Sequence, residues 1–599
     1  MIDIGLWGEE FSIKENNTKD ILKKVKNKKV ESEVSIEKKL KSKVIPIEEK
    51  LRIIEQEVKR VLGRQATNQI MITSREELHN YISNALKYKE IAIDTETNNS
   101  LDALTCKLLG VCLYVPNCPQ AYVPINHRDY NTKERLNWQL TEKDIYDELS
   151  RLINQNIEIY GHNWKFDYKV LKCTTGLVLP ATWDSLIAAR LIDESDGAQA
   201  GLKQLYIKFI DPDQEKYKID KLFSGIELVD SIPEIFTYYA ATDARETYEL
   251  VHWQKDYLNQ PDERKVLNLF NTVEMPLVQV LAEMELTGIK VDRDFAARLS
   301  AKYHKKSEEV ERKITLELLE LAPIIDAWKV SPRSKLVTPS KSGAVKNPKM
   351  KIEQLSDPIE LSSPTQLAIL LYDILEVPVV DKSDPRGTGE PILSQLVDKY
   401  PICKLILEKK SIDKMLNAFI DTLPNMAGPD GKIHCSFRQC GADTGRLSCT
   451  EPNLQQAPGH GDEMSIRCLF AAEEGYTFVG SDFKSQEVRV LAGLSGDEQM
   501  IQAFKEEKDL YAYVASIAFD KPYEECMEFN PKTGEKQVEG KERRSQAKSI
   551  VLGRLTGFGQ EHNAQYKLCE PYYSWVSEMA NGRRQIFIRE PKHILNMQW

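Results

Sequence analysis

This sequence of 599 residues has no paired cysteines and no long apolar run, and we expect no leader segment at its start. Its 11 cysteines are scattered, with no Cys-x-x-Cys motif and no paired Cys/His spacing, so we predict free thiols rather than a zinc site or a disulfide framework. No apolar run has the length that spans a bilayer, and the start, Met1-Ile2-Asp3-Ile4, does not resemble a signal peptide. We therefore expect an intracellular, cytoplasmic protein with no membrane partner.

Basic residues are also fewer than acidic ones, and the formal net charge is -10. This disfavours a protein coated in nucleic acid over its whole surface, although enzymes that grip DNA confine their basic residues to a cleft. The stretch from Lys14 to Arg60 is rich in Lys and Glu with few aromatics, which indicates a helical or disordered lead-in. Residues 327–352 carry seven Lys or Arg, no acid and three prolines, and we predict a flexible basic loop there, either a solvated insertion or a DNA contact.

The length exceeds what one core supports and suggests roughly three or four domains. After a charged lead-in over 1–70, residues 71–258 alternate strands with helices, which predicts an α/β domain with a mixed sheet. We expect strands at Ile91–Asp94, Leu108–Val115, Ala121–Ile125 and Ile157–Tyr160. We expect helices at Trp164–Cys173, Asp184–Asp193 and Ile232–Lys255.

Helical periodicity dominates residues 259–425, with a long charged helix from Asp292 to about Leu321 and another from Pro364 to Leu375. The basic segment 327–352 is an insertion in this region. Residues 426–553 mix strands and helices, and the strands are expected at Lys432–Phe437 and Thr477–Asp482. Turn-forming Pro and Gly residues support the domain boundaries near 258 and 425. Residues 554–599 are expected to form a divergent C-terminal tail.

Acidic residues stand in three separated blocks, Asp94-Thr95-Glu96, Asn163 with Asp167, and Tyr239 with Asp243. Strand alternation points Asp94 and Glu96 to one face, and the four-residue spacing of Tyr239 and Asp243 gives them one helix face. Each block alone is also common as a solvated surface group. Carboxylates converging from a strand and two helices would repel one another unless cations neutralised them, and hard oxygen ligands select Mg²⁺ or Mn²⁺.

The order Asp-x-Glu, Asn-x-x-x-Asp, Tyr-x-x-x-Asp resembles the proofreading 3′-5′ exonuclease domain of DNA polymerases, which has a ribonuclease H-like fold. Asp184-Ser185-Leu186 and Leu202-Lys203-Gln204-Leu205 also match. The resemblance implies single-stranded 3′ ends as substrate and two ions roughly 3.5–4 Å apart, held by four acids. These acids are Asp94, Glu96, Asp167 and Asp243. It further implies that Tyr239 orients the attacking water, that Asn163 supports the strand end or the DNA, and that Leu101 wedges against the terminal base.

Later motifs resemble family A DNA polymerases, the bacterial DNA polymerase I class. Glu274-Met275-Pro276-Leu277 and Gly288-Ile289-Lys290-Val291-Asp292 resemble the entry into a helical thumb. Thr444-Gly445-Arg446-Leu447-Ser448 and Pro452-Asn453-Leu454-Gln455 resemble the segment that meets the minor groove of a primer-template. The resemblance implies DNA contacts from Thr444, Arg446, Asn453 and Gln455, because such side chains bond to acceptors that every base pair presents. Gly459-His460 replaces an arginine that the family places after the proline.

Two further segments resemble a partial α+β palm and fingers. In Ser481–Arg489, the resemblance implies that Asp482 ends an apolar strand and binds catalytic Mg²⁺, that Glu487 excludes a 2′-hydroxyl, and that Arg489 contacts DNA. In Arg543–Gly553, the four-residue spacing of Arg544, Lys548 and Leu552 gives one helix face. The resemblance implies that the two cations hold the triphosphate of a deoxynucleoside triphosphate, with Lys548 also catalytic, and that Leu552 packs on its sugar and base.

After Gly553 the motifs end, and the last palm motif, which supplies a second metal-binding aspartate, does not occur before Trp599. One palm aspartate does not assemble a two-metal site, so we expect this chain alone to polymerise poorly. An intervening element such as an intron within the fingers helix, or a polymerase split with a second chain, would account for this. A 5′ nuclease domain is also not expected in the roughly 75 residues before the exonuclease. This suggests a phage-type replicative enzyme that acts in a host cytoplasm.

The leading hypothesis is therefore a family A DNA polymerase with a complete proofreading exonuclease and an incomplete polymerase site. A second hypothesis is a DNA exonuclease whose polymerase remnant grips the substrate. A third is a DNA-binding subunit that needs a partner chain to complete the palm.

Overall fold

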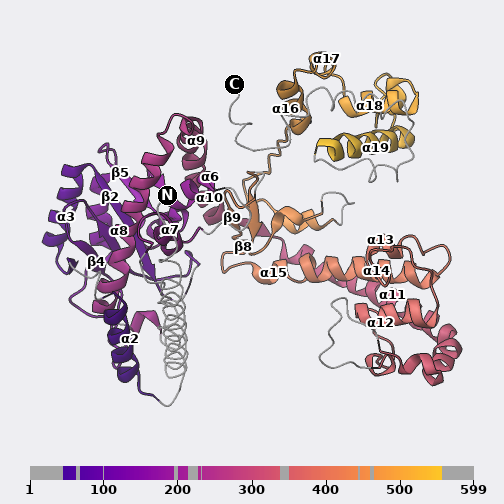
Figure 1. The fold of residues 1–599 in the computed structure, drawn as a ribbon, viewed down its shortest axis with the longest axis horizontal. Helices are drawn as coiled ribbons and strands as arrows, with labels where there is room; N and C mark the ends of the chain where they lie inside the picture. Colours follow the sequence, from indigo (N-terminus) through magenta and orange to yellow (C-terminus); the bar gives the residue numbers. More distant parts are fainter. Residues whose placement is uncertain are drawn as a thin grey trace, which may run out of the picture. The chain divides into compact units, whose positions relative to one another are not determined.

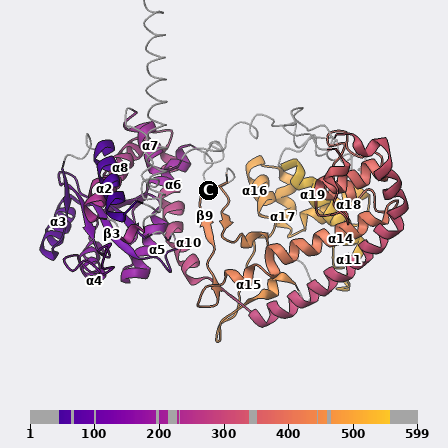
Figure 2. The ribbon, with the colours of Figure 1, turned by 90° about the horizontal axis from the view of Figure 1, so that it is seen from below.

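The computed structural model describes residues 45–62, 68–98, 100, 102–193, 200–212, 227–230, 232–337, 350–442, 445–458 and 465–555. The chain divides into two compact units, Met1–Tyr476 and Thr477–Trp599 (Figures 1 and 2). Part of the predicted charged lead-in forms helix α2 (Ile47–Leu62). Among the described residues, no helix is long and apolar enough to cross a membrane.

The first unit begins with a six-stranded mixed sheet of strand order β1-β4-β3-β2-β5-β6. The strands β2, β3 and β4 pair antiparallel, whereas β1 runs parallel to β4, and β5 and β6 continue parallel to β2. The strands are β1 (Gln69–Met71), β2 (Glu90–Thr97), β3 (Leu108–Tyr114), β4 (Gln120–Pro124), β5 (Glu158–Gly161) and β6 (Trp183–Asp184). The four predicted strands are confirmed, and the two short edge strands β1 and β6 were not predicted.

Helices cover this sheet, and they include the three that the sequence predicts. They are α3 (Arg75–Tyr88), α4 (Glu142–Leu149), α5 (Trp164–Thr175), α6 (Ser185–Ile192), α7 (Leu202–Phe209) and α8 (Pro233–Leu258). Helix α8 packs along β2, β3 and β4 and is drawn across the sheet in Figure 1. Since Ile91, Ala92 and Ile93 are fully buried, β2 is held in the centre of the core, and its last residues carry the acids to a fixed position.

A helical region follows, with helices α9 (Arg264–Leu269), α10 (Met275–Thr287), α11 (Arg293–Val330), α12 (Pro364–Ala368), α13 (Glu390–Leu393), α14 (Pro401–Met415) and α15 (Leu423–Met426). The long helix α11 continues past the predicted end near Leu321 and contains Pro323. A proline in a helix interior costs about 3 kcal/mol, but Ile325 and Trp328 in the following turns are buried in an apolar cluster that offsets this cost. The start of the predicted basic loop is therefore helical, and residues 338–349 lie outside the described part.

The predicted strand Lys432–Phe437 is two strands. Strand β8 (Lys432–Ile433) joins a three-stranded sheet with β7 (Ile289–Val291) and β11 (Phe470–Ala471). Strand β9 (Ser436–Arg438) pairs antiparallel with β10 (Ser448–Thr450) instead. The break falls at His434, whose ring bonds through Nδ1 to the Glu285 carbonyl of α10 at 2.7 Å and so turns the chain from one sheet to the other.

The second unit is helical, with a core formed by α16 (Gln486–Ser495), α17 (Glu498–Lys505), α18 (Leu510–Phe519) and α19 (Val538–Leu555). The predicted strand Thr477–Asp482 is wrong, because these residues have no strand structure and Phe478 and Val479 are exposed. A strand needs a hydrogen-bonded neighbour, and no strand of the described residues pairs with this segment. Asp482 consequently lies in an exposed loop rather than at a strand end.

Candidate exonuclease active site

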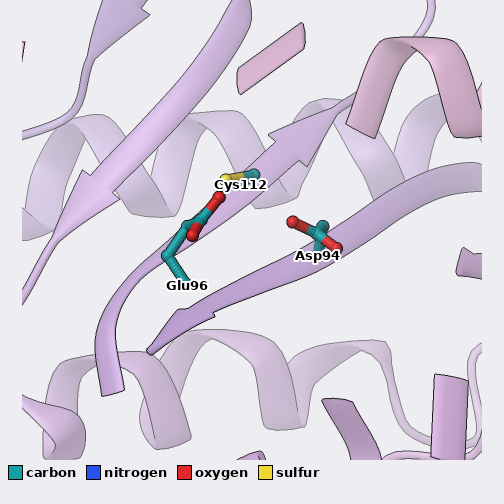
Figure 3. Close-up of side chains that lie close together, drawn as sticks. All are labelled: Asp94, Glu96 and Cys112. Atoms are coloured by element: carbon teal, nitrogen blue, oxygen red, sulfur yellow. The ribbon is translucent and has the colours of Figure 1, made fainter. Parts of the chain in front are cut away.

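The end of β2 presents two acids side by side. Asp94 and Glu96 are half-buried on one face of the strand, and Thr95 and Thr97 are buried on the other. Across the antiparallel pair, Asp94 lies directly opposite Cys112 of β3. One carboxylate oxygen from each acid and the Cys112 sulfur lie within 4.8 Å of one another. Figure 3 shows these three side chains close together.

Asp167 reaches the same place from helix α5. The Asp184 carboxylate accepts hydrogen bonds from the backbone N–H groups of Asn163 and Trp164, at 2.9 and 2.7 Å, and these bonds fix the start of the helix. Asp167 is then buried in the first turn, where its Oδ1 accepts from both the backbone N–H (2.9 Å) and the hydroxyl (2.6 Å) of Thr95. Asn163 itself has φ 60°, and its exposed side chain does not cap the helix.

Helix α8 supplies the remaining two residues. The Tyr239 hydroxyl donates to Glu96 Oε2 at 3.4 Å. One turn later, Asp243 forms an ion pair with Lys203 of α7, which also contacts the fully buried Glu246 at 3.0 Å. The sequence singled out the segment around Lys203 only as a supporting match, and the structure places its ammonium group on the predicted acid Asp243.

The acids strongly perturb one another. Burial, and next the Asp243 carboxylate, raise the pKa of Glu96 to about 8, and burial raises the pKa of Asp167 to about 7. The pKa of Asp94 is raised well above its ordinary value, by burial first and then by Asp167 and Glu96. Lys203 lowers the pKa of Asp94 and Glu96, but less than burial and the neighbouring acids raise it. A set of hard oxygen donors with this excess of negative charge fits divalent cations.

The minor-groove residues of the sequence prediction surround strand β10. Arg446, Asn453 and Gln455 are all exposed. The Asn453 side chain accepts from the Gln455 backbone N–H at 3.2 Å and caps a short 3₁₀ turn, Leu454–Gln456. Gln455 Nε2 donates to the Leu447 carbonyl at 3.3 Å, which holds the segments before and after β10 together. Thr444 and Leu101 lie outside the described residues.

In the second unit, Arg544 and Lys548 share one face of α19 as predicted, since both stand over the Tyr511 ring, at 5.4 and 5.8 Å from its centroid. Arg544 also bonds to Asp509 at 2.8 Å. Burial, and next the negative charge of the exposed Glu487, raise the pKa of Tyr511. The sequence reasoning missed Tyr511, because an aromatic residue inside an apolar helix carries no signal of its own.

Two of the predicted residues of this unit make other contacts. Leu552 is half-buried and packs against the apolar core of the unit. Arg489 donates to the Lys484 carbonyl at 2.9 Å, and its guanidinium lies 4.5 Å from the Phe504 ring centroid.

Comparison with known proteins follows the same division of the chain. Residues 69–255 match the family model described as 3′-5′ exonuclease, and residues 339–569 match that of DNA polymerase family A. The second match continues beyond Gly553, where the sequence motifs ended. These matches and the fold define a chain that joins a domain of the 3′-5′ exonuclease family to a region of DNA polymerase family A.

Individual relatives agree with this class. The DNA polymerase I of Borreliella burgdorferi is 28% identical over 450 residues, which are 75% of this chain and 44% of that protein. The thermostable DNA polymerase I of Thermus aquaticus is 30% identical over 411 residues, 68% of this chain and 40% of that protein. The chain therefore belongs to family A of the DNA polymerases, and it spans less than half the length of these relatives.

A solved structure shares the fold. The POL domain of Pol1 from M. smegmatis, in complex with DNA primer-template and dNTP, aligns with a TM-score of 0.64 at 22% identity, covering 86% of this chain and 76% of that chain.

Proposed function

We propose that this chain hydrolyses nucleotides from DNA 3′ ends at the Asp94 site, as the proofreading part of a family A DNA polymerase that acts in replication in the cytoplasm. The observation that carries the proposal is the convergence of Asp94, Glu96 and Asp167, from a strand and a helix, with Tyr239 of a second helix hydrogen-bonded to Glu96. The raised pKa values of the three acids support a site built for cations.

The residues have separate roles in this proposal. Asp94, Glu96, Asp167 and Asp243 would hold two Mg²⁺ or Mn²⁺ ions, which when bound activate water and stabilise the leaving oxygen. The Tyr239 hydroxyl, already directed at Glu96, would orient the water. Thr95 holds Asp167 in place through two hydrogen bonds, and Lys203 holds Asp243. Leu101 and Asn163 would contact the strand end.

The polymerase residues are proposed to bind primer-template and deoxynucleoside triphosphates. The M. smegmatis structure that shares this fold contains both ligands. Thr444, Arg446, Asn453, Gln455 and Arg489 would contact DNA. Arg544 and Lys548 would hold the triphosphate, Glu487 and Leu552 would bound the sugar pocket, and Asp482 would bind Mg²⁺.

The test uses the purified chain, Mg²⁺ and a labelled primer-template. We expect the primer to shorten, and Asp94→Ala to slow shortening by roughly 10²-fold or more because a metal ligand is lost. Asp147→Asn, which alters a half-buried acid of α4 away from the converging acids, is the matched control and should degrade at the wild-type rate. Unchanged degradation by Asp94→Ala would refute the assignment.

A second candidate function is a DNA exonuclease whose polymerase-like region only grips the substrate. The exposed position of Asp482, in a loop without a strand partner among the described residues, favours it. Adding deoxynucleoside triphosphates to the same assay separates the two functions. Primer extension supports the polymerase, and extension that needs an added second chain supports a split enzyme. Degradation without any extension supports the exonuclease whose polymerase-like region only holds the substrate.

A further inference from the structure

Strand β3 adds a sulfur atom to the acidic site at the end of β2. In the β2–β3 register, Cys112 is the direct partner of Asp94, and Gly110 is the partner of Glu96. Directly opposed residues of an antiparallel pair have Cβ atoms about 4.5–5.5 Å apart, and diagonal neighbours are also within reach of long side chains. Cys112 is therefore next to Asp94 across the strands and diagonal to Glu96, on the face that both acids share.

The opposite strand offers no competing side chain at Glu96. Residue 110 is glycine, and a Cβ atom there would lie 2.4 Å from the ring of Tyr122, which packs against it. The thiol is thus the nearest group that β3 presents to the two acids, and in Figure 3 it lies beside the Glu96 carboxylate.

The Cys112 thiol lies beside the acids, and within the described part of the chain it has no other polar partner. Its side chain is 0% exposed, and no hydrogen bond to its sulfur is found among the described residues. The sulfur and one oxygen from each acid lie within 4.8 Å of one another. Three ligand atoms this close together are a donor set that one divalent ion could bridge after small side-chain shifts.

We propose that Cys112, Asp94 and Glu96 form a binding site for a thiophilic divalent ion, Zn²⁺ or its analogues Co²⁺ and Cd²⁺. One thiolate and two carboxylates suit these ions, whereas Mg²⁺ has little affinity for sulfur. Binding forms a metal–sulfur bond, breaks the S–H bond and releases its proton to solvent. This inference rests on the proposed function, because the ion would compete with Mg²⁺ for Asp94 and Glu96 and so inhibit degradation.

The experiment is a Cd²⁺ titration of the intact chain, followed by the ultraviolet charge-transfer absorption of cadmium–thiolate bonds. We expect a saturable phase in the wild-type chain that Cys112→Ser removes. Cys403→Ser, which alters another fully buried thiol, in the helical region, is the matched control and should retain the phase. Asp94→Asn keeps the thiol and should weaken Cd²⁺ binding by at least about 10-fold. Circular dichroism checks that each variant is folded.

The outcomes separate this inference from the proposed function. If Cys112→Ser and Asp94→Asn both bind Cd²⁺ like the wild-type chain, the ion site is refuted, whether or not the chain degrades DNA with Mg²⁺. If the Cys112-dependent phase is present but Mg²⁺ supports no degradation, the ion site holds and the exonuclease proposal fails. If Cys112→Ser does not fold, the Asp94→Asn titration tests the ion site alone: weaker Cd²⁺ binding supports the site, and unchanged Cd²⁺ binding refutes it.

Discussion

At the scale of single residues, Thr95 determines where Asp167 lies. Its backbone N–H and its hydroxyl both donate to Asp167 Oδ1, so the strand that carries two acids also positions the third. A hydrogen bond to a charged group contributes about 1.5–3 kcal/mol. Thr95 is thus a positioning residue that a list of acids in the sequence does not contain.

Thr95→Val replaces the hydroxyl by a methyl group of similar size. We expect the single-turnover rate of 3′ end degradation to fall about 10-fold, because a loss of about 1.4 kcal/mol in positioning corresponds to that factor. Thr97→Val is the matched control on the same face of β2, since the Thr97 hydroxyl bonds only to the backbone oxygens of Asn98 and Ser100. Equal losses in both variants would contradict a specific role of Thr95.

His162 is a half-buried histidine whose uncharged state costs the domain stability at acid pH. Burial lowers its pKa to about 4 from an ordinary value of 6.5, and its Nδ1 lies 2.8 Å from Ser185 Oγ. Since the unfolded chain takes up the proton at a higher pH than the folded one, the contribution of His162 to stability falls as the pH drops from about 6.5 toward 4. The raised pKa values of Glu96 and Asp167 act in the opposite direction in the same domain, so the test compares two chains rather than two pH values. The urea midpoint at about pH 5 minus that at about pH 7.5 should therefore be larger in His162→Asn than in the wild-type chain. An unchanged difference would exclude His162 as the source.

At the scale of elements, sequence pattern predicts a strand but not its partner. The buried run Ile91-Ala92-Ile93 was enough to predict β2, and alternation placed Asp94 and Glu96 on one face. Thr477–Asp482 has similar apolar character, yet it pairs with no strand among the described residues and is exposed. Cys112 was missed for the same reason, because only the β2–β3 register brings it opposite Asp94. Strand pairing depends on residues far apart in the sequence. The four-residue spacing of Tyr239 and Asp243 is local, so it was enough to predict that both lie on one face of a helix.

Helices α5 and α10 are joined by one buried acid. Glu285, which is 3% exposed, contacts Lys165 and Lys169 of α5, each at 2.5 Å, and accepts the Phe437 backbone N–H at 2.7 Å. Removing the buried acid from such a network leaves the half-buried Lys165 and Lys169 without their carboxylate, which costs up to about 3 kcal/mol.

Glu285→Ala should lower the free energy of unfolding of the first unit by about 3 kcal/mol in urea titrations. Glu283→Ala is the matched control on the same helix. The ion pair of Glu283 with Lys172 is 38% and 33% exposed, and Glu283 also accepts from the Tyr168 hydroxyl, so its loss should cost about 1–2 kcal/mol, less than that of Glu285. If both variants lost a similar free energy of unfolding, the buried ion pairs of Glu285 would stabilise the protein no more than the exposed pair of Glu283.

At the scale of the whole molecule, the two candidate chemistries belong to different units. The converging acids lie in Met1–Tyr476, whereas Arg544 and Lys548 lie over Tyr511 in Thr477–Trp599. Each unit has an apolar core of its own, so a surface substitution in one leaves the packing of the other intact. The activities should therefore be separable by single substitutions in the full chain.

Lys548→Ala tests this separation. The loss of a charge-assisted contact to a triphosphate should weaken deoxynucleoside triphosphate binding about 10-fold in equilibrium titrations, while degradation of a single-stranded 3′ end stays at the wild-type rate. Lys541→Ala removes the same charge from the same helix, but Lys541 pairs with Glu528 at 3.0 Å, so nucleotide affinity should not change. Equal weakening in both variants would indicate a general effect of charge on α19. Slower degradation by Lys548→Ala alone would show that the second unit takes part in holding the strand that the first unit cleaves.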